Sequence, residues 1–263
     1  MVPRLHASQR PKEKVSEMTM HNKLAILFGY VGRMIGILLI LSVVAAVPAL
    51  AQQDYVGRWD VYGGFTPLVR PSLDLTEYGF NFQGGYRATT WVTLGFDYSV
   101  ATGSNVLASG MLAPALASQL GAQLGQMAQA GLIPPNYTLA VPTNARTQTF
   151  QAGTDFPIRK FKTVTFYVRP NLGAMQLIAT LRPADPIAKA VVAGLAPTGK
   201  KTDWTYFYGF GGGFEINVTP HFAMRFQADF AHDNVFDGIL KSGNTIRVSV
   251  GPAFQFGKNV AGR

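Results

Sequence analysis

The sequence predicts an all-β fold, an eight-stranded antiparallel up-and-down transmembrane barrel with short helices in long extracellular loops. Three observations support this prediction. Charged residues make up 14% of the chain, against roughly 25% in an average soluble protein. After residue 51, apolar residues alternate with small or polar ones in eight short segments, and they do not collect into the run of about 20 that a membrane helix needs. The connections between these segments are alternately long and short.

Residues 1–51 are predicted to be a leader that contains a signal peptide. The stretch MIGILLILSVVAAV at 34–47 is apolar throughout, and Ala49 and Ala51 precede Gln52 in the small-x-small pattern of a cleavage site. An uncleaved membrane anchor is the alternative, and the stretch is short for one. The start of translation stays open among three internal methionines, Met18, Met20 and Met34. Residues 52–263 then form one barrel domain.

Each strand segment is expected to turn a large apolar face to lipid and a small or polar face to the lumen. In the sixth segment, Trp204 and Tyr206 share one parity, and Thr205 and Gly209 share the other. Tyr and Trp near strand ends are typical of the aromatic girdles at a membrane interface. The eight segments are 55–65, 77–86, 90–100, 146–154, 163–174, 203–216, 222–231 and 244–256.

The lengths of the connections predict how the barrel is oriented. The short connections are 87–89, 155–162 and 217–221. The long connections are 66–76, 101–145, 175–202 and 232–243. Bacterial membrane barrels keep short turns in the periplasm and long loops outside the cell, so the long connections are expected outside.

Two of the long connections contain predicted helices, at 107–132 and at 185–195. Leucines recur at helical spacing in the first. Asp185 followed by Pro186 is a typical start for the second, because Asp caps a helix and Pro suits its first position. Two interpretations stay open: these helices contact lipopolysaccharide or a partner, or they only cap the mouth of the barrel.

The inward parity carries four arginines and four acidic residues, which form the candidate site. They are Arg58, Asp60, Asp97, Arg169, Glu215, Arg225, Asp229 and Arg247. Buried charges are costly unless they are paired, and arginine forks bridge carboxylates well. The hypothesis is a paired network that plugs the narrow lumen, with glycines at 209, 211 and 213 leaving room for Tyr62 and Tyr167. The alternative for any one of these residues is a solvated position at the rim.

Composition excludes several classes of function. The chain has no Cys, so disulfides, thiolate metal sites and cysteine nucleophiles are absent. No metal-ligand spacing or nucleotide-binding motif occurs, and we expect no cofactor and no metal. The seventeen basic residues after residue 51 are scattered rather than clustered, which disfavours nucleic-acid binding. His232 beside Asp233 is one ingredient of a catalytic site, but no motif supplies a nucleophile, and we expect no catalytic residues.

Residues 52–263 resemble the OmpA-type superfamily of outer-membrane protein β-barrel domains. The segments that support this resemblance are RWDVYGGFTPL, YGFNFQGGYRATTWVTLGFDYS, YFYGFGGGFEINVTPHFAMRFQADF and RVSVGPAFQFG. The resemblance implies a monomer in the bacterial outer membrane with periplasmic termini and a plugged lumen. Its expected partners are outer-membrane lipid, lipopolysaccharide and the outer-membrane assembly machinery, but no nucleic acid. Two departures are the lack of a following peptidoglycan-binding domain and an end without a terminal aromatic, so the assembly signal is expected at the internal Phe256.

The expected function is non-enzymatic, with a structural, adhesive or envelope-integrity role. Three alternatives stay open. A small-solute porin would need a continuous lumen. An outer-membrane enzyme that processes lipids or peptides would depend on His232 and Asp233. A soluble lipocalin-like carrier would need an aqueous outer surface.

Overall fold

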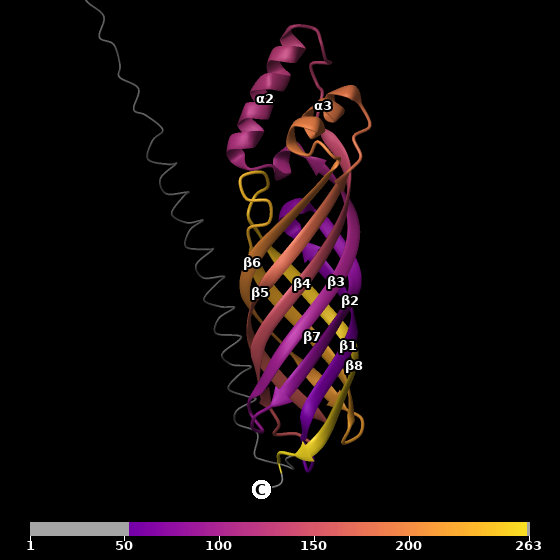
Figure 1. Cartoon of the computed structure of the whole chain (residues 1–263), viewed down its shortest axis with the longest axis vertical. Helices are drawn as coiled ribbons and strands as arrows, with labels where there is room; N and C mark the ends of the chain where they lie inside the picture. The colour runs from indigo at the N-terminus through magenta and orange to yellow at the C-terminus, as the bar shows by residue number, and fades with distance from the viewer. Residues whose placement is uncertain (1–52, 262–263) are drawn as a thin grey trace, which may run out of the picture. The chain divides into compact units, whose positions relative to one another are not determined.

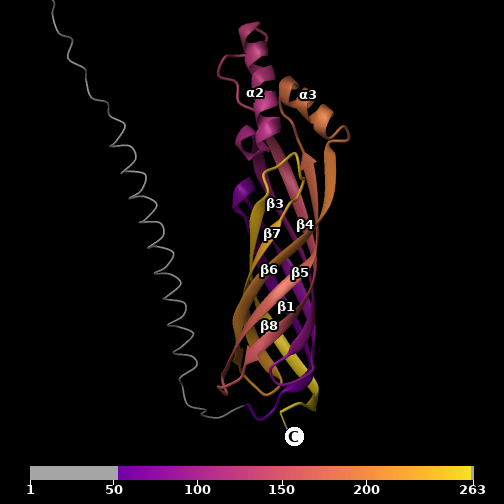
Figure 2. The same cartoon turned by 90° about the vertical axis from the view of Figure 1, so that its left-hand side faces the viewer.

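Eight antiparallel strands each pair with the next along the chain, and β8 pairs back with β1 to close a barrel (Figures 1 and 2). The structure is a computed structural model and describes residues 53–261. The predicted fold class is confirmed. The predicted leader lies outside the described residues and stays a prediction.

All eight predicted segments coincide with strands. The strands are β1 (Gly57–Arg70), β2 (Leu75–Arg87), β3 (Thr93–Ala108), β4 (Ala140–Ile158), β5 (Val164–Leu181), β6 (Lys200–Asn217), β7 (Phe222–Asp233) and β8 (Gly243–Asn259). Most of them extend beyond the predicted bounds. In β4, for example, the exposed Asn144 and Arg146 stay in the ladder although their polar side chains end the apolar alternation. A strand that leaves the hydrocarbon no longer needs apolar outward residues, so the pattern stops before the strand does.

The connections divide the barrel into two ends. Short connections at 88–92, 159–163 and 218–221 form what we call the turn end. The other connections, at 71–74, 109–139, 182–199 and 234–242, form what we call the cap end. The prediction of a long loop at 66–76 is wrong. Thr66–Arg70 continues β1, and a single 3-10 turn, η1 (Pro71–Leu73), leads into β2.

Two helices stand at the cap end (Figure 1). The helix α2 (Pro114–Gln129) follows the 3-10 turn η2 (Ser109–Met111). It ends in a Schellman motif, in which Gly131 has a positive φ of 69° and the amide of Leu132 donates to the carbonyl of Met127 at 2.9 Å. The second helix, α3 (Pro186–Leu195), begins where the sequence predicts it. The Asp185 carboxylate accepts hydrogen bonds from the amides of Ile187 and Ala188, at 2.9 and 2.8 Å, and caps the helix.

The outer wall of the barrel is apolar and its interior is polar. Outward side chains such as Phe80 and Tyr206 are 58% and 88% exposed. Inward polar side chains such as Asn81 and Gln227 are buried. A soluble protein has the opposite arrangement, so the soluble-carrier alternative is contradicted. Among the described residues, no helix is long and apolar enough to cross a membrane.

The cap of α3 generates a pH-dependent prediction. The amide of Ala188, followed by smaller contributions such as the hydroxyl of Tyr137, lowers the pKa of Asp185 from its ordinary value. A carboxylate with a lowered pKa stabilises the fold above its ordinary pKa and loses that effect as the pH falls through the lowered value. At neutral pH, Asp185→Ala should therefore reduce the hydrogen-exchange protection of the amides at 187–189. Well below pH of about 3.9, the ordinary value, variant and parent should converge, and unchanged protection at neutral pH would contradict the cap.

Candidate functional site in the barrel lumen

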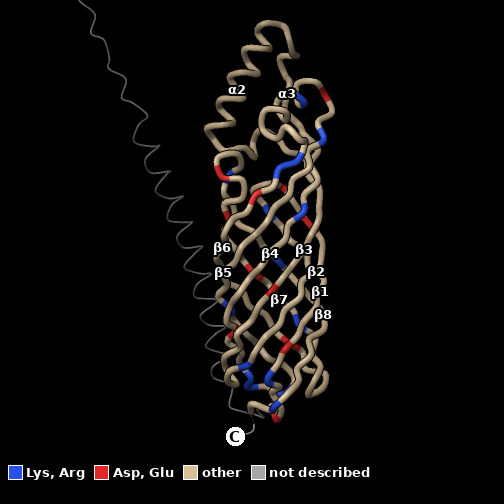
Figure 3. The backbone as a smooth tube through the Cα atoms, viewed as in Figure 1, with Lys and Arg blue, Asp and Glu red and all other residues tan. Residues whose placement is uncertain are grey.

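The structure places seven of the eight predicted charged residues inside the barrel, each 5% exposed or less. These seven are Asp60, Asp97, Arg169, Glu215, Arg225, Asp229 and Arg247. They come from six different strands, and charged positions follow the barrel at several heights (Figure 3). Two clusters of ion pairs hold them.

The first cluster, which we call the lower cluster, lies nearer the turn end and consists of Asp60, Arg87, Glu215 and Arg225. Asp60 receives two arginines: Nη2 of Arg87 lies 2.5 Å from its Oδ2, and Nη2 of Arg225 lies 2.7 Å from its Oδ1. Arg225 also bonds Glu215, with Nε 2.8 Å from Oε1. The cluster therefore joins β1, β2, β6 and β7 across the lumen.

Two tyrosine rings enclose the Arg225 guanidinium. The ring centres of Tyr62 and Tyr167 lie 5.1 and 5.7 Å from its central carbon, within range of cation–π attraction. Tyr167 uses space that a glycine provides, since a Cβ at Gly213 would lie 2.9 Å from its hydroxyl. Tyr62 is placed differently from the prediction, because its hydroxyl fills the space above Gly64 rather than that above the β6 glycines.

The second cluster, which we call the middle cluster, consists of Asp97, Arg169, Asp229 and Arg247. Arg247 donates hydrogen bonds to Asp97 from both terminal nitrogens, at 2.8 and 2.6 Å, and to Asp229 at 2.6 Å. Arg169 lies 3.3 Å from Asp97 and 3.7 Å from Asp229. Each arginine thus faces two carboxylates, an arrangement that offsets the cost of removing four charges from water.

One amide links the two clusters. The Oε1 of Gln83 accepts from Arg225 at 2.9 Å, and its Nε2 donates to Asp97 at 2.9 Å. Asp155 adds a contact from β4, 3.6 Å from Arg169. All eight strands therefore supply at least one charged side chain to a single network, which we call the lumen network.

The prediction that Arg58 belongs to this network is wrong. Arg58 is the second residue of β1, where the pairing with β8 is irregular. Its guanidinium donates to the hydroxyl of Tyr86 at 3.2 Å and lies 5.5 Å from the centre of that ring, at the exposed rim. No ion pair of Arg58 occurs within residues 53–261.

Arg87 takes the place that was predicted for Arg58, so four arginines still meet the four predicted acids. The sequence does not place Arg87 in the network because the predicted short connection at 87–89 includes it. The inward parity of β2, which includes Asn81 and Gln83, leads directly to Arg87, and extending it by one step would have found the residue.

A third group of charges lies nearer the cap end and was also missed. Arg70 lies 3.9 Å from Asp233 and donates to Thr245 at 3.2 Å. Glu77 is buried close by and accepts from Thr147 at 2.6 Å. Arg70 falls within the segment predicted to be a long loop. Glu77 is the first residue of the predicted strand 77–86 and shares its inward parity, but it is not among the predicted network residues.

An apolar layer of side chains lies in the lumen above these charges. Leu75, Val141, Leu177, Phe207 and Leu240 belong to one buried cluster at the cap end. Leu240 comes from the β7–β8 connection, and Val192 of α3 packs into the same cluster. The lumen is therefore polar in its middle and apolar beneath the cap, and the periodicity of the sequence did not reveal that change.

His232 and Asp233 do not form a catalytic pair. They are adjacent in β7, so their side chains point to opposite faces of the wall. Asp233 is buried and accepts from Thr245 at 2.6 Å, whereas the half-buried His232 contacts Asn244 at 2.9 Å. Within residues 53–261, no group of His, Asp and Glu side chains could hold a metal ion.

The family follows from a comparison of the whole sequence with known families. The sequence model of the family described as outer membrane protein beta-barrel domain matches residues 37–254. The chain belongs to this family. It is an outer-membrane β-barrel, and the predicted location in the bacterial outer membrane is confirmed.

Solved structures of outer-membrane barrels are similar to this chain at low identity. Neisserial surface protein A is 11% identical, over 75% of this chain and 96% of its own, with a TM-score of 0.47. Ail, the attachment invasion locus protein of Yersinia pestis, is 11% identical over 76% and 99%, with a TM-score of 0.43. OprG from Pseudomonas aeruginosa is 10% identical over 80% and 100%, with a TM-score of 0.41. No curated protein matches the sequence.

In an outer-membrane barrel the short turns face the periplasm, so the turn end of this protein is periplasmic and the cap end is outside. The described chain begins and ends at the turn end, where the amide of Val260 donates to the carbonyl of Val56. Arg159 helps to close this end by donating to Gln53 at 3.1 Å. Burial lowers the pKa of Arg159 to about 10, and it therefore stays charged at neutral pH.

The middle cluster predicts that replacing Arg247 and replacing Arg58 lower the free energy of unfolding by different amounts. Arg247→Leu leaves Asp97 and Asp229 with fewer partners in a buried site and should lower the free energy of unfolding by about 3–5 kcal/mol. Arg58→Leu removes a charge of the same type at the solvated rim and should cost less than about 1 kcal/mol. Denaturant titration in lipid vesicles, followed by gel mobility, measures both. Equal losses in the two variants would show that Arg247 is not held in a buried network.

Proposed function

We propose that this protein is a sealed, non-enzymatic barrel with a structural or adhesive role, which holds a folded cap outside the outer membrane. The observation that carries the proposal is the lumen network. Arg247 bonds carboxylates of β3 and β7 while it is itself part of β8, so paired side chains cross the lumen rather than line it. An ion moving through would have to separate these buried pairs, which is costly.

The apolar layer supports the same proposal. Above the lumen network, the buried Leu177 and Leu240 belong to a cluster to which both the wall and the cap contribute. A hydrated solute would lose its water a second time there, at a cost of several kcal/mol for each unsatisfied polar group. A porin, which needs a continuous lumen, would need neither the lumen network nor the apolar layer.

The cap supports an outward role. Most of α2 is exposed, and only Leu120 within it is buried. Below the cap, Arg146 and Lys200 are exposed on the outer wall of β4 and β6, beyond the aromatic Trp204 and Tyr206. Cations placed just outside an interfacial aromatic girdle suit the phosphate groups of lipopolysaccharide. The barrel closes within one chain, which supports a monomer.

The measurement that tests this proposal is single-channel conductance of the refolded barrel in a planar bilayer. We expect no steady conductance at neutral pH, because the lumen network and the apolar layer both block ions. A stable ohmic conductance would overturn the sealed barrel in favour of a small-solute pore.

Two controls make a silent bilayer informative. Heat-modifiable gel mobility shows that the sample contains folded barrel. The chain has no Cys, so Gln123→Cys on the exposed face of α2 gives a unique label. Labelling of that position by a membrane-impermeant maleimide from one side only shows that the barrel is inserted and that the cap projects from the membrane.

A further inference from the structure

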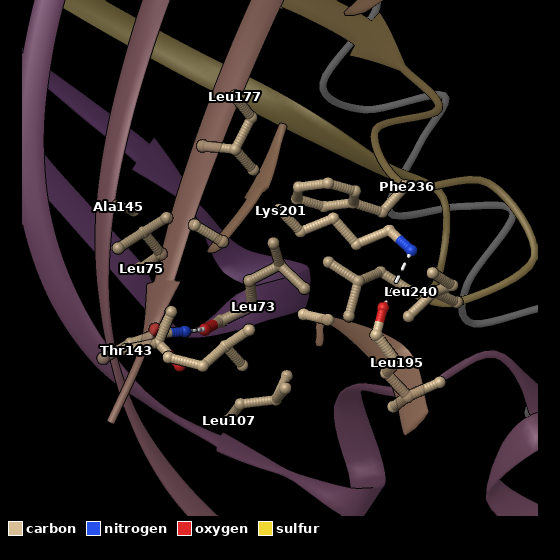
Figure 4. Close-up of a pocket in the computed structure, with 15 residues that line it drawn as sticks. Leu73, Leu75, Leu107, Thr143, Ala145, Leu177, Leu195, Lys201, Phe236 and Leu240 are labelled. Atoms are coloured by element: carbon tan, nitrogen blue, oxygen red, sulfur yellow. Dashed lines mark hydrogen bonds between the residues drawn. The ribbon is translucent and has the colours of Figure 1, made fainter. Parts of the chain in front are cut away.

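We propose that the cap end holds a binding site for one unbranched aliphatic carboxylate, such as a medium-chain fatty acid. This inference goes beyond the sealed barrel and does not rest on it. It comes from a cavity inside the mouth of the barrel that the lumen network and the predicted site residues do not use (Figure 4).

The cavity is enclosed by aliphatic side chains from the wall and the cap. Leu75, Leu107, Ala145 and Leu177 line it from β2, β3, β4 and β5. Phe236 and Leu240, from the β7–β8 connection, lie on the opposite side (Figure 4). The polar atoms of Asn105 at its edge are turned to protein, since the side-chain amide donates to the carbonyl of Leu73 at 2.7 Å. The walls therefore favour a hydrocarbon.

The shape of the cavity favours a single chain. It holds about 610 Å³ of space without protein atoms, part of which is open to solvent. Its enclosed part is narrow, with a cavity volume of about 70 Å³. A slender alkyl chain fits such a space better than a ring system or a branched lipid.

Lys201 supplies the polar end of the site. Its side chain extends beside the Phe236 ring, and its ammonium group donates to the carbonyl of Leu195 at 3.2 Å (Figure 4). An ammonium has three donors, and no ion pair of Lys201 occurs among the described residues. A cation at the edge of an aliphatic cavity is the complement of a chain that ends in a carboxylate.

The nearest acid along the strand is already engaged. Asp203 accepts from the amide of Phe236 at 2.5 Å and from that of Trp204 at 2.9 Å. Phe236 has a φ of 52°, a left-handed conformation that is unusual for a bulky residue. Such strain persists only where neighbours hold it. Asp203 therefore holds the Phe236 ring over the cavity. Because Asp203 is engaged in this way, the ammonium group of Lys201 is left available to a ligand.

The test uses the full barrel in nanodiscs and a dodecanoate probe with a photoreactive diazirine in its chain. Unlabelled dodecanoate and 1-dodecanol serve as competitors, and peptide mass spectrometry locates the label. Lys201→Met removes the charge and is matched by Lys200→Met, which changes the exposed lysine next to it. Ala179→Phe fills the cavity and is matched by Ala174→Phe on the other face of β5.

We expect saturable labelling near Leu177 and Leu240, displaced by dodecanoate at lower concentration than by dodecanol. Lys201→Met should weaken the competition by dodecanoate about tenfold, the loss of one charge-assisted bond, while Lys200→Met leaves it unchanged. Ala179→Phe should abolish labelling, and if that variant fails to fold, the lysine pair still decides. Labelling confined to lipid-facing peptides, or equal competition by the alcohol with no effect of Lys201→Met, would overturn the site.

Discussion

The fork of Arg247 between Asp97 and Asp229 is the interaction on which the rest of the barrel depends. It joins β8 to β3 across the lumen and to the neighbouring β7, and all three side chains are buried. Because side chains alternate between the faces of a strand, a slip of one residue in any of these strands would turn a charge toward lipid. The pairing of charges inside therefore fixes the register of the wall outside, and closure of the barrel follows from both.

The lumen changes character along the barrel axis. Paired charges occupy its middle, where the outer wall is apolar, and aliphatic side chains occupy the part beneath the cap, where outward residues such as Arg146 are polar. At each height along the barrel axis, the polarity of the lumen is thus opposite to that of the outer wall. The apolar upper layer also anchors the connections, because Val192 of α3 and Leu240 of the β7–β8 connection are buried in it. The cap is part of the same packed structure as the wall.

The alternation of apolar and polar residues was sufficient to predict the fold, the face of each strand and seven of the network residues. It failed where the surroundings of a strand change. Arg58 and Arg87 both lie near the turn end of the barrel, and the partner that each one finds depends on pairing between distant strands. Arg70 lies in the part of β1 where Pro67 and the inward-facing Leu68 interrupt the alternation of apolar and polar residues, although the ladder continues. The cavity joins residues from five strands and the cap, and no local pattern predicts such a set.

The most direct test of the central claim is a double-mutant cycle on Arg247 and Asp97, using Leu at both positions, with the free energy of unfolding measured in lipid vesicles. If the two residues belong to one buried network, each single change leaves an unpaired charge that the double change removes. We predict a coupling energy of about 1–3 kcal/mol, the range for contacting residues. Additivity of the two single losses within about 0.5 kcal/mol would contradict a paired charge network as the basis of the sealed barrel.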